Sequence, residues 1–89
     1  MSRFLETLKN GPLVADGGMG SMLHQIAEAS FRCTDELNLR EPDSVLSVHV
    51  RFIRAGARLI ETNTFGANRL KLRALGLEDQ LLAINQRGV

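Results

Sequence analysis

The stretch Leu-Val-Ala-Asp-Gly-Gly-Met-Gly at residues 13–20 passes directly from an apolar run into a glycine-rich turn. A second stretch of this kind lies at residues 57–68, where Ala-Arg-Leu-Ile precedes Glu-Thr-Asn-Thr-Phe-Gly-Ala-Asn. Each apolar run is typical of a buried β-strand, and parallel α/β proteins bind ligands where such strands end. The two stretches therefore predict one ligand held between neighbouring strand ends.

The sequence around these stretches has the periodicity of amphipathic helices. We expect helices over residues 3–9, 19–29, 42–55, 68–75 and 79–86 and strands over 13–15 and 58–62. Residues 30–40 are expected to form an irregular loop. Pro42 suits a first helical turn, and Gly56 suits a helix end. Strands that alternate with helices predict an α/β fold with a parallel sheet and right-handed crossovers.

Length and composition limit the chain to one small domain. The 89 residues would leave both edges of a two-stranded sheet open, and the pattern stops inside an apparent helix, so we expect the front of a larger domain. A net charge of +1, with four Phe and neither Trp nor Tyr, gives no reason to expect nucleic-acid or membrane binding. The N-terminus lacks a signal-peptide pattern, which predicts a cytoplasmic location. The single cysteine, Cys33, excludes an internal disulfide and a thiolate metal site within the chain.

The first motif, residues 16–20, has the chemistry of an anion site. Glycines at 17, 18 and 20 permit unusual backbone conformations and let a ligand approach main-chain N–H groups. These groups open the next helix, which favours a carboxylate or a phosphate. Asp16 would accept hydrogen bonds from an ammonium group or orient the loop; a plain strand-to-helix turn is the alternative. Leu23 stands where a dinucleotide fingerprint needs glycine, so that reading is excluded.

The second motif, residues 61–68, places polar side chains directly after a predicted strand. Alternation puts Thr62 and Thr64 on one face and Glu61 and Asn63 on the other, without fixing which pair faces a ligand. The alternative is a polar loop in which Asn68 caps a helix. The other candidates, His24, His49 and Cys33, have no partners at ligand or catalytic spacing and are interpreted as packing or surface residues.

Three segments carry a resemblance to a known family. Asp-Gly-Gly-Met-Gly at 16–20, Asp-Glu-Leu-Asn at 35–38 and Glu-Thr-Asn-Thr-Phe-Gly-Ala-Asn-Arg at 61–69 resemble the homocysteine S-methyltransferase family, across about residues 4–89. The resemblance implies a (β/α)8 TIM barrel, of which this chain would be about the first two β/α units. Residues 1–89 would then be an incomplete homocysteine-binding domain, truncated at its C-terminus.

The resemblance also implies a reaction, in which a methyl group passes from a donor to the thiol of homocysteine to form methionine. The substrate-binding residues carried over are Asp16, Gly17, Gly18, Thr62, Asn63 and Thr64. The family binds the homocysteine thiol to zinc through three late cysteines, and none of them is in this chain. We therefore expect no catalytic or metal-binding residue here and no activity of the chain alone. The resemblance leaves room for cobalamin or folate in a full-length protein.

Two other readings of the chain stay open. It could be a small α/β module that binds an amino acid or a protein without catalysis. It could also be one half of a split barrel, whose partner chain supplies the remaining strands and the cysteines.

Overall fold

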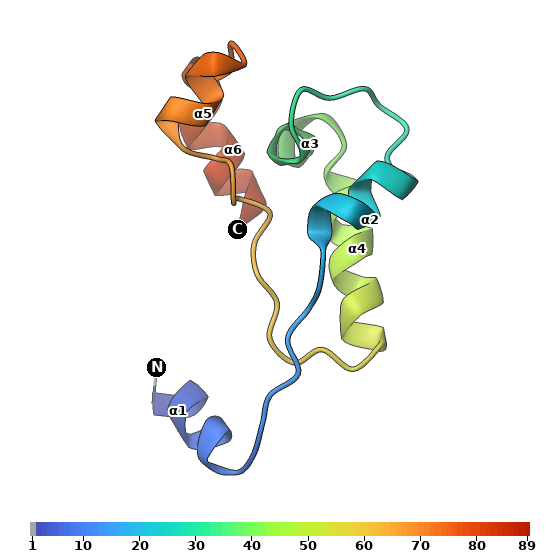
Figure 1. Ribbon diagram of the computed structural model, residues 1–89, viewed down its shortest axis with the longest axis vertical. Coiled ribbons are helices and arrows are strands. Elements are labelled where there is room, and N and C mark those ends of the chain that lie inside the picture. Colours follow the sequence, from blue (N-terminus) through green and yellow to red (C-terminus); the bar gives the residue numbers. More distant parts are fainter. Residues whose placement is uncertain (1) are drawn as a thin grey trace.

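The computed structural model describes residues 2–89 as helices joined by extended segments and loops (Figure 1). The molecule is elongated, with principal extents of 45 × 26 × 16 Å. The elements, in chain order, are α1 (Ser2–Lys9), α2 (Met19–Ile26), the 3-10 turn η1 (Thr34–Glu36), α3 (Leu37–Arg40), α4 (Pro42–Arg54), α5 (Arg69–Ala74), the 3-10 turn η2 (Glu78–Gln80) and α6 (Leu81–Gly88).

The predicted helices are present, and their ends follow local chemistry. Pro42 is the first residue of α4, where a missing N–H costs nothing. Gly56 follows α4 with φ of +115°, a conformation that favours glycine. Helix α2 ends at Ile26, before the predicted end at residue 29. The reason is Glu41, whose carboxylate accepts hydrogen bonds from the N–H groups of residues 28 and 29 outside the helix.

The expected loop over residues 30–40 is wrong in its second half. Residues 34–40 form η1 and α3. Helix α3 packs against both α4 and α6. The sequence did not predict this helix, because three polar side chains of the segment are buried together with Leu37 and interrupt the hydrophobic periodicity. These side chains are Asp35, Glu36 and Asn38.

The expected α/β class, and with it the start of a TIM barrel, is corrected by the structure. Over residues 2–89 it contains helices but no strand and no sheet. The two runs predicted as strands do lie side by side, but they meet only in one isolated parallel bridge, Ala15 with Leu59. Val14 O accepts from the N–H groups of residues 58 and 59, and Leu59 O accepts from Asp16 N–H at 2.9 Å.

The pairing stops there for a physical reason. Parallel sheets are stable when both faces are covered and each inner strand has two neighbours. Here each run has one neighbour within the described chain, and Val14 remains 61% exposed. Neither run is therefore the buried strand that its apolar residues predicted.

Two hydrophobic clusters hold the helices together. The first joins α2, α3 and α4 through Leu23, Leu37, Val45 and Val48. The second joins α5 and α6 through Ala67, Leu72, Leu77 and Ile84, with Leu39 of α3 packed against it. Helix α1 lies apart from both groups, beyond the bridge (Figure 1).

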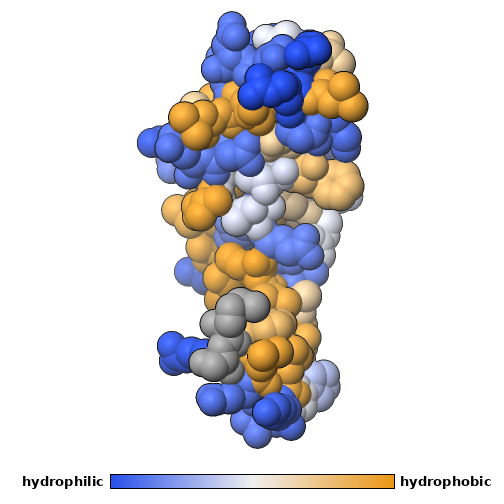
Figure 2. Space-filling model, turned by 90° about the vertical axis from the view of Figure 1, so that its left-hand side faces the viewer, coloured by the Kyte–Doolittle hydropathy of each residue, from blue (hydrophilic) through white to orange (hydrophobic). Residues whose placement is uncertain are grey.

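Part of the apolar surface is exposed. In Figure 2 hydrophobic residues spread over the lower half of the molecule, the part where α1 and the extended runs lie. Phe4, Leu5 and Leu8 of α1 are exposed, and so are Leu59 and Ile60 of the second run. The tight packing is thus confined to the helices at the other end, next to the two motifs.

Candidate functional site

The two glycine- and threonine-bearing motifs face one cavity of about 290 Å³. Residues 16, 17, 19 and 20 line one side, residues 61–65 line the other, and Thr34 completes the wall. Of the six predicted site residues, five lie on this cavity: Asp16, Gly17, Thr62, Asn63 and Thr64. Gly18 does not line it.

A larger cavity of about 600 Å³ lies along α4, beside residues 86–89. Its walls are mostly apolar side chains, and Thr62 is the one residue that it shares with the smaller cavity. His49, on its wall, has a buried Nδ1 atom without a hydrogen-bond partner among the described residues. Neither motif is centred on this cavity, so the smaller one is the candidate site.

Asp16 joins the two walls of the site. Its Oδ2 accepts a hydrogen bond from the backbone N–H of Glu61 at 3.0 Å. The contact lies next to the Ala15–Leu59 bridge, so it continues the pairing of the two runs by a side chain. A carboxylate has about four acceptor positions, and this contact uses one of them. Asp16 can therefore tie the second motif to the first and still accept from an ammonium group.

The start of α2 supplies backbone donors. Gly18 is the N-cap residue, and no side chain caps the helix there. The first N–H groups of a helix have no partner within it and carry the positive end of its dipole. Met19 and Gly20, in this first turn, line the cavity. This edge of the site thus favours a negatively charged group.

Glycine in the first motif is explained by the lack of room for a side chain and not by an unusual backbone conformation. The glycines with positive φ are Gly11, Gly56 and Gly76, so the expectation of special conformations at 17, 18 and 20 is wrong. A Cβ at Gly17 would lie 3.1 Å from Cε1 of Phe52, which belongs to α4. Glycine at position 17 therefore lets the first wall pass close to α4.

In the second motif two hydroxyl groups lie together. The Oγ1 atoms of Thr62 and Thr64 are 2.7 Å apart and share a hydrogen bond. Phe65 follows at the edge of the cavity with 92% of its surface exposed. Lys71 Nζ lies 4.7 Å above the centre of the Phe65 ring. The motif thus brings two paired threonines to the cavity wall and an aromatic ring beneath a cation to its rim.

Asn63 lines the cavity, but its side chain forms hydrogen bonds with residues behind the cavity wall. It is 5% exposed, and its Nδ2 donates to Thr34 O and to Asn38 Oδ1, both at 2.9 Å. Asn38 Nδ2 in turn donates to Asn63 O at 2.8 Å. The two threonine hydroxyls are thus paired with each other, whereas the asparagine side chain is held by the helical scaffold.

Sequence reasoning assigned no role to the residues behind the second motif. Asp35 Oδ2 accepts from Gly66 N–H at 3.0 Å, and Glu36 accepts from Arg32 N–H at 2.7 Å. In the sequence, Asp35 and Asn38 are distinguished only as members of the segment 35–38, which carries part of the family resemblance. The sequence signal that could have indicated their burial is a group of three polar residues around Leu37, in a segment without helical periodicity.

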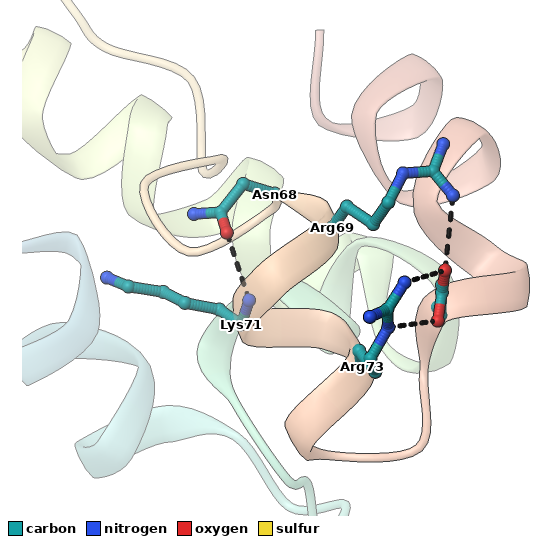
Figure 3. A network of polar contacts seen from close by, with 5 residues as sticks. Asn68, Arg69, Lys71 and Arg73 are labelled. Carbon is teal, nitrogen blue, oxygen red and sulfur yellow. Dashed lines mark hydrogen bonds and ion pairs between the residues drawn. The ribbon is translucent and has the colours of Figure 1, made fainter.

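Asn68 is a helix cap, as one reading of its motif predicted. Its Oδ1 accepts from Lys71 N–H at 3.0 Å at the start of α5 (Figure 3). Arg69 and Arg73 both pair with Glu78, and Figure 3 shows the Lys71 side chain extending away from this network. The pairing with Arg73, and then with Arg69, lowers the pKa of Glu78.

The remaining candidates have structural surroundings. Burial raises the pKa of the Cys33 thiol, which packs against the second hydrophobic cluster and is therefore a weak nucleophile. The His24 ring packs on Phe31 with centroids 5.0 Å apart. Within residues 2–89 no group of three or more His, Cys, Asp or Glu side chains could hold a metal ion, so these residues do not fit a zinc site. No helix of this range combines the length and apolar character needed to cross a bilayer.

Comparison with known proteins identifies the family. The sequence model of the family described as homocysteine S-methyltransferase matches residues 13–89, a range that includes both motifs and the segment behind them. The chain therefore belongs to the homocysteine S-methyltransferase family.

Two relatives from mycobacteria show the same relationship. The chain is 39% identical over 90 residues to a methionine synthase of Mycobacterium leprae (strain TN). It is 35% identical over 91 residues to a methionine synthase of Mycobacterium tuberculosis (strain ATCC 25618 / H37Rv). Each alignment covers 94% of this chain and 8% of the relative, so the chain spans about a twelfth of the length of these relatives.

Proposed function

We propose that the cavity of about 290 Å³ binds homocysteine, as part of an enzyme that transfers a methyl group to the homocysteine thiol and forms methionine. One observation carries the proposal. Two acidic residues, Asp16 and Glu61, and the unblocked start of α2 line the same small cavity. A free amino acid presents an ammonium and a carboxylate on adjacent atoms, and these two groups need acceptors and donors respectively.

The residue roles follow from this complementarity. Asp16 accepts from the ammonium group, and the backbone N–H groups at Met19 and Gly20 donate to the carboxylate. Thr62 and Thr64 line the opposite wall, where their hydroxyl groups form further hydrogen bonds. Gly17 keeps the first wall close to α4. Gly18 acts only as the N-cap residue at which α2 begins. The backbone of Asn63 forms part of the cavity wall.

The proposal gives this chain substrate binding without catalysis. The methyl donor and the remaining polypeptide of a longer enzyme are the further partners. Zinc would have its ligands outside residues 1–89, because the described residues do not fit it. Cobalamin or folate would likewise belong to other parts of such an enzyme. The isolated chain is therefore expected to form no methionine, and its cytoplasmic location stays a prediction.

Calorimetric titration of the 89-residue chain with reduced L-homocysteine tests the proposal. We expect saturable binding, weakened about tenfold or more in Asp16→Asn because the negative charge that pairs with the ammonium group is lost. Asp43→Asn is the matched control, since Asp43 lies in the first turn of α4 and does not line this cavity. The absence of homocysteine binding by the wild-type chain would overturn the proposal, as would equal losses in the two variants.

A further inference from the structure

Two buried side chains hold the second motif from behind. Asp35 is 4% exposed and Asn38 is 1% exposed, and neither lines the cavity of about 290 Å³. Asp35 Oδ2 accepts from Gly66 N–H at 3.0 Å. Asn38 and Asn63 exchange two hydrogen bonds, from Asn38 Nδ2 to Asn63 O and from Asn63 Nδ2 to Asn38 Oδ1. The segment from 63 to 66 is thus attached at both of its ends.

The space around these attachments is filled. A Cβ on Gly66 would lie 2.9 Å from Asp35 Oδ1. A Cβ on Gly88, in the last turn of α6, would lie 2.6 Å from Asn38 Nδ2 and 2.8 Å from Thr64 Cγ2. Separations below 3.0 Å leave no room for a side chain at either position. The loop therefore cannot retreat from the cavity without moving α3 or α6.

Both NH2 groups of the amide pair have their full number of acceptors. Asn38 Nδ2 also donates to Ile84 O at 3.1 Å, and Asn63 Nδ2 also donates to Thr34 O. Both NH2 groups thus have two acceptors each, and Asn38 Oδ1 has a donor. Buried hydrogen bonds of this kind favour one geometry, because a shift would leave buried NH2 groups without acceptors.

We propose that Asp35 and Asn38 are positioning residues for the ligand in this cavity. They act through Gly66 and Asn63 to fix Thr62 and Thr64, which line the cavity. This inference rests on the proposed homocysteine binding and extends it to residues that do not touch the ligand. Binding sites need such support, because a wall held loosely loses affinity even when every contacting residue is present.

The test compares Asp35 with another carboxylate that also accepts from backbone N–H groups. Glu41 Oε1 accepts from Ala29 N–H at 2.9 Å, and Glu41 does not line the cavity. The variants are Asp35→Ala and Asp35→Asn against Glu41→Ala and Glu41→Gln. Three quantities are measured in the full 89-residue chain: the Kd for L-homocysteine, the urea midpoint of unfolding, and the amide chemical shifts of Thr62 and Thr64 without ligand.

We expect Asp35→Ala to raise the Kd about tenfold or more and to shift both threonine amides. Asp35→Asn, which keeps an acceptor of the same size, is expected to recover most of the affinity. The Glu41 variants should lower the urea midpoint while the Kd and the threonine shifts stay unchanged. If Asp35→Ala does not fold, Asp35→Asn against Glu41→Gln decides, with a Kd about threefold higher expected in Asp35→Asn alone.

The outcomes separate the two proposals. A wild-type chain that binds homocysteine, with Asp35 variants that match it in Kd and threonine shifts, would overturn the positioning role alone. Equal changes in the Asp35 and Glu41 variants would also overturn it, because the effect would then be general destabilisation. A wild-type chain that does not bind homocysteine would overturn both the proposed function and this inference.

Discussion

The carboxylate of Asp16, one residue beyond the Ala15–Leu59 bridge, accepts a hydrogen bond at 3.0 Å from the backbone N–H of Glu61, two residues beyond that bridge on the second run. The same side chain is the proposed partner of an ammonium group. Asp16 therefore combines a structural task with a binding task, and the two can be separated by experiment.

Replacing Asp16 by alanine should lower the free energy of unfolding by about 1 kcal/mol, the usual net value of one hydrogen bond. Urea unfolding followed by circular dichroism measures this loss. Asp43→Ala provides the comparison, because Asp43 lies in the first turn of α4 and does not line the cavity between the two motifs. Unchanged stability in Asp16→Ala would show that the two runs are held by the backbone alone.

Gly17→Ala should destabilise the chain by about 1 kcal/mol, since the new methyl group would press on the Phe52 ring from 3.1 Å. Gly20→Ala is the control, because its Cβ would first meet Thr34 Cγ2 at 3.8 Å, an ordinary contact distance. The double variant Gly17→Ala with Phe52→Leu should recover part of the loss, as contacting sites are not additive. Additive losses in the double variant would contradict the contact.

Acid should weaken the fold partly through Glu41. Hydrogen bonds from Ser44, and then from Ala29 N–H, lower the pKa of Glu41 below the ordinary value of 4.5. A carboxyl group with a lowered pKa stabilises the fold above its unfolded pKa, and this contribution disappears as the pH falls through the lower folded value. Thermal unfolding between pH 7 and pH 3 should therefore show a smaller acid-induced decrease in Tm for Glu41→Gln than for the wild type. Parallel curves would exclude this role.

The cap of α5 gives a further prediction. Asn68→Ala removes the acceptor for Lys71 N–H and should cost about 1 kcal/mol of unfolding free energy, whereas Asn68→Asp should retain most of it. Hydrogen exchange of the Lys71 amide reports on the cap directly. Exchange at the wild-type rate in Asn68→Ala would contradict the assignment.

Local signals in the sequence were sufficient for most helices. Pro42 and Gly56 bound α4 as predicted, because a missing donor and a positive φ are properties of single residues. The two predicted strands are absent from residues 2–89, because a strand depends on its neighbours and not on single residues. The apolar runs predicted burial between neighbouring strands, and in the structure the two runs have only each other, with one bridge between them.

The sequence predicted that the two motifs lie close together, but not the contacts that hold them there. Asp16 and the two threonines surround one cavity, as polar residues after two neighbouring runs suggested. The inward turn of Asn63 depends on Asn38, and the position of Gly66 depends on Asp35. Such partners lie far away in sequence, and a buried polar residue looks like a loop residue when only hydrophobic periodicity is considered.

Helix α3 is only one turn long, yet Leu37 belongs to the first hydrophobic cluster and Leu39 packs against the second. Two leucines, two residues apart on opposite sides of one turn, make the two clusters parts of the same cooperative unit. Opening either cluster would withdraw the support that α3 gives to the other. Slow-exchanging amides of α4 and α6 should therefore exchange through one shared opening event, with α1 exchanging much faster because it belongs to neither cluster.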